Sequence, residues 1–135
     1  MSACAVYQLA IGLYFAVLRP PLLPEDLRFL GTAPGALAAA APRLEHWLHL
    51  VFIVLGGQIA AVGVLTAALA LRLSQGRALG WRELTLLGGA GALSVGTMSV
   101  VNLVLQSDFR WPLIVPVAAW AVAVALATRD ASNEH

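Results

Sequence analysis

Two histidines and two carboxylates near the edges of long apolar segments are of the residue types that bind metal ions. Glu45 and His49 are four residues apart, and His46 and His49 are three apart, spacings that share one face of a helix. Zinc accepts imidazole nitrogens and carboxylate oxygens, so Asp108 or Glu25 would add a further ligand. The order of these residues differs from the H-E-x-x-H motif of zinc enzymes. A metal site of Glu45, His46, His49 and Asp108 is therefore a weaker interpretation than ordinary histidines at the edge of an apolar segment.

A second group of polar side chains lies within the apolar segments themselves. One interpretation is that these amides, hydroxyls and rings form structural hydrogen bonds between helices. The other is that they line a cavity for an amphiphilic small molecule, with its head at Asn102 and His49 and its tail among apolar walls. The candidate ligand-binding residues are Gln8, Tyr14, His49, Gln58, Asn102, Gln106 and Trp120.

The distribution of charge decides which elements must position these residues. Of the 135 residues, 60% are hydrophobic and 11% are charged. All the charges fall outside four stretches, which are residues 1–18, 46–71, 84–107 and 111–128. A water-soluble domain needs a polar face on each element, and these stretches have none, so a soluble protein is excluded. The eight basic residues are offset by seven acidic ones and do not cluster, which excludes nucleic-acid binding.

Each uncharged stretch is long enough to cross a hydrocarbon core about 30 Å thick, the first and last narrowly. Backbone groups cannot remain unpaired in lipid, so the crossings must be helices. The sequence therefore predicts one all-α domain over residues 1–135, a polytopic membrane protein with four transmembrane helices in an up-down bundle. Residues 1–18 lack a basic region and a signal cleavage site, so we expect a retained first span.

The segment 19–45 is too long for a simple turn and predicts an interfacial helical lid between the first two spans. Pro24, Glu25 and Asp26 favour the start of a short helix, which Gly31 would end. Thr32 would cap a second short helix, stopped at Pro42. In the fourth span, Pro112 suits the first helical turn, whereas Pro116 should kink or shorten the helix. We also expect local ion pairs between Glu25 and Arg28 and between Asp108 and Arg110.

The first link connects the first two spans, and the third link connects the last two. Four antiparallel spans put these two links on the same side of the membrane. The arginines tie four to four, with Arg72, Arg77, Arg82 and Arg129 on one side and Arg19, Arg28, Arg43 and Arg110 on the other. The link 72–83 carries three arginines against one glutamate, which favours a cytoplasmic location for it and for both termini. The single cysteine, Cys4, excludes an intrachain disulfide and dithiol chemistry.

Small residues recur at helical spacing in the second and third spans and predict where helices approach closely. The two faces carry Gly56, Ala60 and Gly63 in one span and Gly88, Ala92 and Gly96 in the other. We expect these two spans to pack on each other. The alternative is that one of the faces forms a homodimer or meets a partner.

The run PEDLRFLG, followed by PRL and VLGGQIAAVGVL, carries a partial resemblance to a known group. It is similar to a pattern in small, uncharacterised bacterial membrane proteins that are loosely DoxX-like. The resemblance covers residues 23–65 and implies a four-helix membrane fold with no activity or catalytic residue attached.

We therefore expect a protein of the bacterial inner membrane that is oligomeric or bound to a partner. We expect a non-catalytic role rather than an enzymatic one. Its main expected role is that of a membrane subunit or a binding protein for a lipophilic small molecule. The alternatives are a dimeric channel or transporter and, third, an enzyme acting on a lipid or quinone at Glu45, His46, His49 and Asp108. No cofactor is indicated by any motif.

Overall fold

The computed structural model describes residues 1–77 and 79–133, and every regular element within them is a helix. The all-α prediction is confirmed. The elements are α1 (Ser2–Leu13), η1 (Tyr14–Leu18), α2 (Pro24–Leu30), α3 (Pro34–Ala40), α4 (Leu44–Ser74), α5 (Trp81–Gly91), η2 (Ala92–Gly96), α6 (Thr97–Val104) and α7 (Ile114–Asn133). The π-helical segments η1 and η2 continue α1 and α5 without a break, so that α5, η2 and α6 form one rod.

Two of these helices are long and apolar enough to cross a membrane. They are α4, with 31 residues, and the continuous rod Trp81–Val104, with 24. The helices Ser2–Leu18 and Ile114–Arg129 are apolar but shorter. The structure therefore supports two of the four predicted crossings by length and composition.

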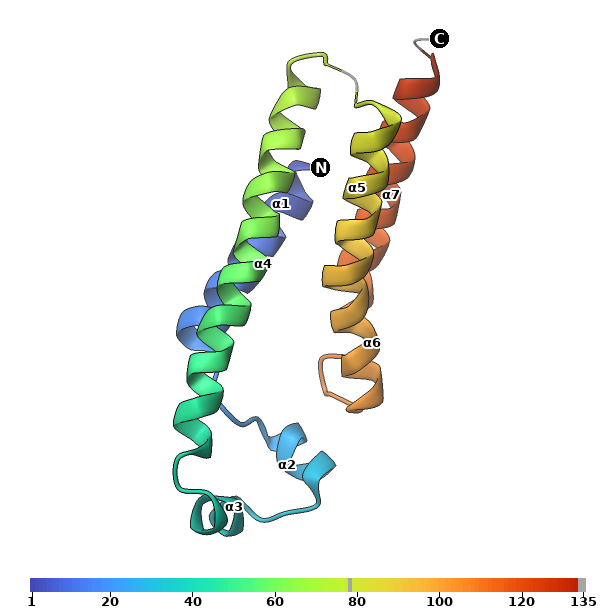
Figure 1. Ribbon diagram of the computed structural model, residues 1–135. Coiled ribbons are helices and arrows are strands. Elements are labelled where there is room, and N and C mark those ends of the chain that lie inside the picture. The colour runs from blue at the N-terminus through green and yellow to red at the C-terminus, as the bar shows by residue number, and fades with distance from the viewer. Residues whose placement is uncertain (78, 134–135) are drawn as a thin grey trace.

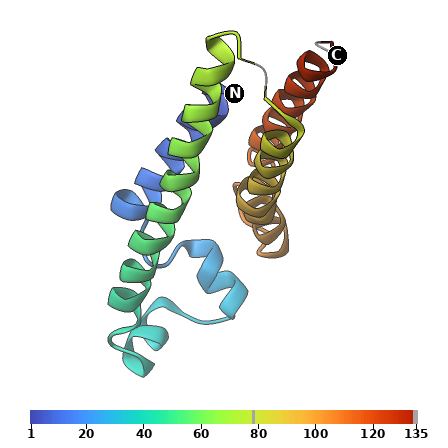
Figure 2. The ribbon, with the colours of Figure 1, turned by 45° about the horizontal axis from the view of Figure 1, so that its top comes forward.

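The long helices alternate in direction along the chain (Figure 1). The start of α1 and the final turn of α7 lie towards the end where α4 leads into α5, and α2 and α3 lie at the opposite end, as the second view also shows (Figure 2). The helices form two pairs, α1 along α4 and α7 along α5. The up-down order thus agrees with the prediction, and the segment 19–45 occupies one end of the molecule.

The pair α1–α4 is held by direct contact between backbones. A Cβ atom placed on Gly56 would lie 2.5 Å from the carbonyl oxygen of Gly12 and 2.6 Å from the backbone nitrogen of Ala16. A Cβ atom on Gly63 would lie 2.9 Å from the backbone nitrogen of Leu9. Only glycine permits such an approach, which increases the dispersion contacts between the two helices. The small-residue face of α4 is therefore a packing face, as the sequence predicts.

The predicted partner of that face is wrong. It packs on α1, where the Gly12–Ala16 spacing supplies the complementary small residues, and not on the third span. On the third span, a Cβ atom added to Gly88 would meet nothing within 4 Å, and Ala92 is exposed. Gly96 approaches only the carbonyl of Gly91 in its own rod, at 3.7 Å. Small residues permit close approach but do not select the helix that approaches.

The pair α5–α7 is built from larger side chains. Trp120 of α7 is 5% exposed and lies against Gly91, where an added Cβ atom would meet the indole nitrogen at 1.8 Å. The buried cluster around it contains Leu84, Leu87 and Val95. At the far end, the Ser99 hydroxyl donates to the carbonyl of Leu113 at 2.9 Å. Gly91, adjacent to the predicted stripe, is therefore the glycine that packing requires in this half.

The lid contains the two predicted short helices. Gly31 ends α2 in the left-handed conformation at φ 64°, as expected. Ala33, rather than Thr32, is the N-cap residue of α3, which begins with Pro34. In the fourth span, the helix begins at Ile114, so Pro116 falls in its first turn, where a missing N–H group is harmless and no kink is needed.

The link between α4 and α5 is fixed by Glu83. Its carboxylate accepts a hydrogen bond from the backbone N–H of Gly80 at 2.8 Å and a second from the guanidinium of Arg72. These two donors hold the pKa of this link carboxyl below its ordinary value, with the backbone N–H as the larger cause. The same hydrogen bond caps the N-terminus of α5.

Candidate functional site

A polar node at the middle of the long helices joins the two helix pairs. The Gln8 side-chain amide donates to the Ser94 hydroxyl at 3.1 Å and accepts from the Thr66 hydroxyl at 3.2 Å. Gln8 is 1% exposed and Thr66 is 2% exposed. Three helical segments, α1, α4 and η2, therefore meet through one amide. The candidate residues from the sequence include Gln8 but neither Ser94 nor Thr66, each of which is a hydroxyl residue within an apolar stretch.

The other predicted ligand-binding residues are not gathered around this node. The Asn102 amide donates to the Met98 carbonyl of its own helix at 2.8 Å. Tyr14 is 38% exposed, and His49 is half-buried near the start of α4. Gln106 has a positive φ of 51° after α6, and its carbonyl accepts from Arg110. Within the part of the chain that the structure describes, none of the seven candidates hydrogen-bonds to another.

Gln58 has an unusual environment for an amide in an apolar helix. It lies 14 residues after the first residue of α4, near the middle of that helix, and its side chain is exposed. It forms no hydrogen bond with any residue that the structure describes. Exposed apolar residues flank it at Val54, Ala61 and Leu65, one turn or two turns away. Gln58 thus points away from α1 and from the polar node.

Trp120 and Tyr7 contribute two buried polar atoms without partners. The indole nitrogen of Trp120 and the hydroxyl oxygen of Tyr7 are both shielded from solvent, and neither forms a hydrogen bond with a described residue. The two rings belong to the same cluster between the helix pairs. The indole nitrogen lies close to the backbone of Gly91, since a Cβ atom added there would be 1.8 Å from it.

The lid is attached to the third link by two polar contacts, which we call the lid clamp. Arg28 forms an ion pair with Asp108 at 2.9 Å, and the Ser107 hydroxyl donates to Glu25 at 3.1 Å. Glu25 is 5% exposed, whereas both side chains of the ion pair are largely exposed. The expected local pairs Glu25–Arg28 and Asp108–Arg110 are therefore wrong, because α2 folds over the third link. The predicted location of the first and third links at one end is confirmed.

Arg19 anchors the lid to the first helix pair. Its guanidinium carbon lies 3.8 Å from the centre of the Phe52 ring and 5.3 Å from that of Phe15. A guanidinium nitrogen lies 3.5 Å from the Asp26 carboxylate. The charge is thus placed between two aromatic faces and a carboxylate, a stable environment for arginine at the edge of an apolar region.

The four candidate metal ligands are not assembled into one site. Within residues 1–77 and 79–133, no three His, Cys, Asp or Glu side chains lie close enough to hold a metal ion together. Asp108 is paired with Arg28 in the lid clamp, while Glu45 and His46 are exposed on α4. The helical spacing alone does not bring an oxygen ligand from another segment to the histidines.

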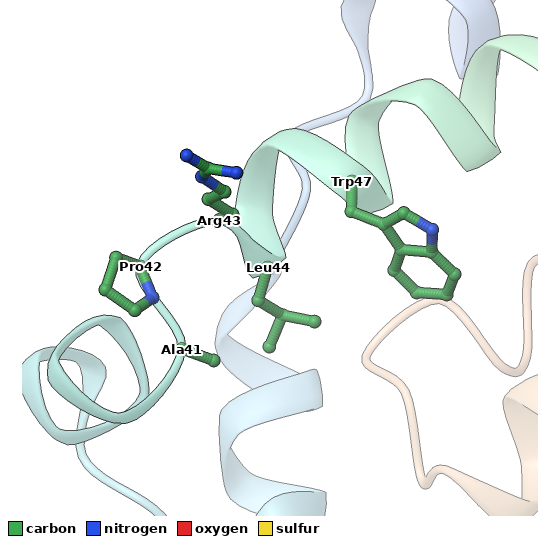
Figure 3. A pocket seen from close by; sticks show the side chains of 5 residues that line it. All are labelled: Ala41, Pro42, Arg43, Leu44 and Trp47. Carbon is green, nitrogen blue, oxygen red and sulfur yellow. The ribbon is translucent and has the colours of Figure 1, made fainter.

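A shallow hollow of about 510 Å³ lies where the lid enters α4. Its lining residues are Ala41, Pro42, Arg43, Leu44 and Trp47 (Figure 3). Leu44 and Trp47 project on one side of the chain and the Arg43 guanidinium on the other. The sequence analysis did not predict this hollow. The pattern that could have indicated it is an arginine four residues before a tryptophan at the boundary of a span.

No protein-family model matches this chain, and no curated protein or solved structure matches it.

Proposed function

We propose that this protein is a four-crossing helical protein of the bacterial inner membrane that acts as a non-catalytic subunit, meeting another transmembrane helix through α4. The membrane part of the proposal is supported by the side chains that the helices expose. Leu93, Leu86 and Leu18 are 80%, 73% and 70% exposed. The polar node is buried between the helices, so the arrangement of polar and apolar groups is the reverse of that in a soluble protein.

The two shorter helices are the additional crossings of this proposal. Ser2–Leu18 and the apolar part of α7 are near the lower length limit for a span, about 17 residues. Arg19 and Pro20 follow the first of these helices, and Pro112 and Arg129 lie near the two ends of the apolar part of α7. A short span is accommodated by local thinning of the bilayer at modest cost.

The orientation with both termini in the cytoplasm is supported by the charge of the link 72–83. This short link carries three arginines and one glutamate. Short links with an excess of arginine stay on the cytoplasmic side of a membrane. The link 72–83 therefore faces the cytoplasm in this proposal.

The exposed amide of Gln58 carries the proposed subunit role. An amide in the middle of a membrane-spanning helix is costly when it faces lipid, and it normally faces a partner. The face of α4 that holds Gln58 is not the face that packs on α1, so a second helix can reach it without disrupting the α1–α4 pair. An interhelical amide hydrogen bond at this position would satisfy the group.

Photo-crosslinking in native membranes tests the subunit role. We expect Gln58→p-benzoyl-phenylalanine to form an adduct, of twice the chain mass for a homo-oligomer or of another defined mass for a partner. The matched control places the same residue at Leu93, which is exposed on η2 in the other half. Equal adducts at both positions, or none at position 58, would contradict the proposal. Ion flux into liposomes containing the purified protein alone would support the channel alternative.

Cysteine labelling tests the crossings separately. In a Cys4→Ala background, Ala39→Cys and Phe109→Cys should react with an impermeant maleimide from the periplasmic side. Ser74→Cys should react only after the membrane is opened. Labelling of all three positions from the same side would contradict four crossings.

A further inference from the structure

We propose that the hollow between Ala41 and Trp47 binds one anionic phospholipid of the surrounding bilayer, with the lipid phosphate at Arg43 and the upper acyl chain against Leu44 and Trp47. This inference rests on the membrane insertion proposed above. It adds the chemical class of a ligand and the position at which that ligand binds. It does not depend on the Gln58 contact.

The charge of Arg43 is available for a ligand. Within the described residues, four arginines have partners: Arg19, Arg28 and Arg72 in ion pairs, and Arg110 at the Gln106 carbonyl. Arg43 is exposed and forms no hydrogen bond or ion pair with any residue in the described part of the chain. The nearest carboxylate in sequence, Glu45, is exposed and is not paired with it. An anion that reaches Arg43 therefore displaces no existing ion pair.

The remaining lining residues favour an apolar group. Ala41, Pro42, Leu44 and Trp47 offer almost no polar atoms besides the backbone and the indole N–H. The hollow of about 510 Å³ is large enough for part of a lipid molecule. Arg43 lines the same hollow as Leu44 and Trp47. Its guanidinium projects on the opposite side of the chain from these two side chains, so a ligand that contacts both needs a charged part at one end and an apolar part at the other (Figure 3).

The position of Trp47 favours a lipid of the bilayer, rather than a water-soluble amphiphile, as the ligand of this hollow. Trp47 is 59% exposed at the boundary between the charged lid and the uncharged stretch 46–71. Exposed tryptophans at such boundaries lie at the headgroup level of a membrane. Phosphate groups and glycerol ester regions are concentrated at this level, so the charge and the apolar surface of the hollow meet the matching parts of one lipid.

Native mass spectrometry of the detergent-purified full chain with added dioleoylphosphatidylglycerol tests the proposal. We expect one tightly bound lipid and an about five-fold loss of its occupancy in Arg43→Gln. Trp47→Ala should also reduce occupancy. The matched control is Arg77→Gln, which removes an equally unpaired arginine at the opposite end and should leave occupancy unchanged. Dioleoylphosphatidylcholine should bind more weakly than the anionic lipid to the unmodified protein.

Three outcomes overturn the proposal. Equal losses in Arg43→Gln and Arg77→Gln would show diffuse attraction by net charge. Unchanged binding in Arg43→Gln would place the lipid elsewhere. Displacement of the lipid by millimolar inorganic phosphate would identify a free-anion site. Failure of membrane insertion would appear separately, as release of the unmodified protein by alkaline carbonate, and circular dichroism of each variant checks that its helices are retained.

Discussion

The two helix pairs solve the same packing problem by different means. In the pair α1–α4, glycines bring two backbones into contact, and the atoms that would meet an added Cβ atom include backbone atoms of Gly12, Ala16 and Leu9. In the pair α5–α7, the atoms that would meet a side chain added at Gly91 belong to the Trp120 ring. A backbone cannot move aside, whereas a ring can rotate or shift. The first pair should therefore tolerate much less change than the second.

The largest effect is expected for Gly56→Leu. Because the added side chain would collide with the α1 backbone, we expect separation of α1 from α4 and a loss of at least about 3 kcal/mol in the free energy of unfolding. A titration with denaturing detergent, followed by circular dichroism, measures this loss. The neighbouring Gly57 has nothing within 4 Å of an added Cβ atom, so Gly57→Leu should change stability by less than about 1 kcal/mol. Similar losses for both variants would remove the distinction between the two faces of α4.

An intermediate effect is expected for Gly91→Ala. The methyl group would overlap the Trp120 indole, which can shift at a cost of about 1–3 kcal/mol. The combination with Trp120→Leu should cost less than the sum of the two single changes, because the smaller side chain leaves space for the methyl group. The same detergent titration measures this double-mutant cycle. Gly88→Ala is the control, since its Cβ atom meets nothing within 4 Å, and additive losses would contradict the proposed contact.

A smaller effect is expected for Gln8→Leu, which removes the hydrogen bonds that connect the two pairs. The Ser94 hydroxyl donates to the Ala90 carbonyl of its own helix, and the single hydroxyl proton of Thr66 can go to the Val62 carbonyl, so neither is left unsatisfied. We therefore expect a loss of about 1 kcal/mol in the free energy of unfolding. A loss as large as that of Gly56→Leu would mean that the node, and not the glycine contact, dominates the stability of the bundle.

The smallest effect is expected for Arg28→Gln in the lid clamp. Both side chains of the Arg28–Asp108 pair are more than half exposed, and such pairs contribute between about 0.2 and 1 kcal/mol. The difference from the unmodified protein should shrink further in high salt, because the pair is screened. Proteolysis of the lid at low and high salt measures it, and an effect that is insensitive to salt would contradict a surface ion pair.

Much of the helical framework follows from the pattern of charges along the sequence. The uncharged stretches 46–71 and 84–107 coincide with long helices, and the positions of Pro24 and Gly31 mark the ends of α2. These features depend on local chemistry, namely which residues can enter a helix or end one. The candidate site was less predictable, because residues at one depth can face each other, face lipid or bond to their own helix. Asn102 does the last of these, while Gln8 bonds between helices.

The helices, their order and the end at which the lid lies follow from the amino-acid sequence, because charge and helix-ending residues act within a few positions of themselves. The packing of α4 on α1 rather than on α5, and the ion pair between Arg28 and Asp108 across 80 residues, could be seen only in the folded chain. These choices depend on the fit between two surfaces. A stripe of glycines indicates that another helix can approach closely, but the shape of the opposing surface decides which helix packs there.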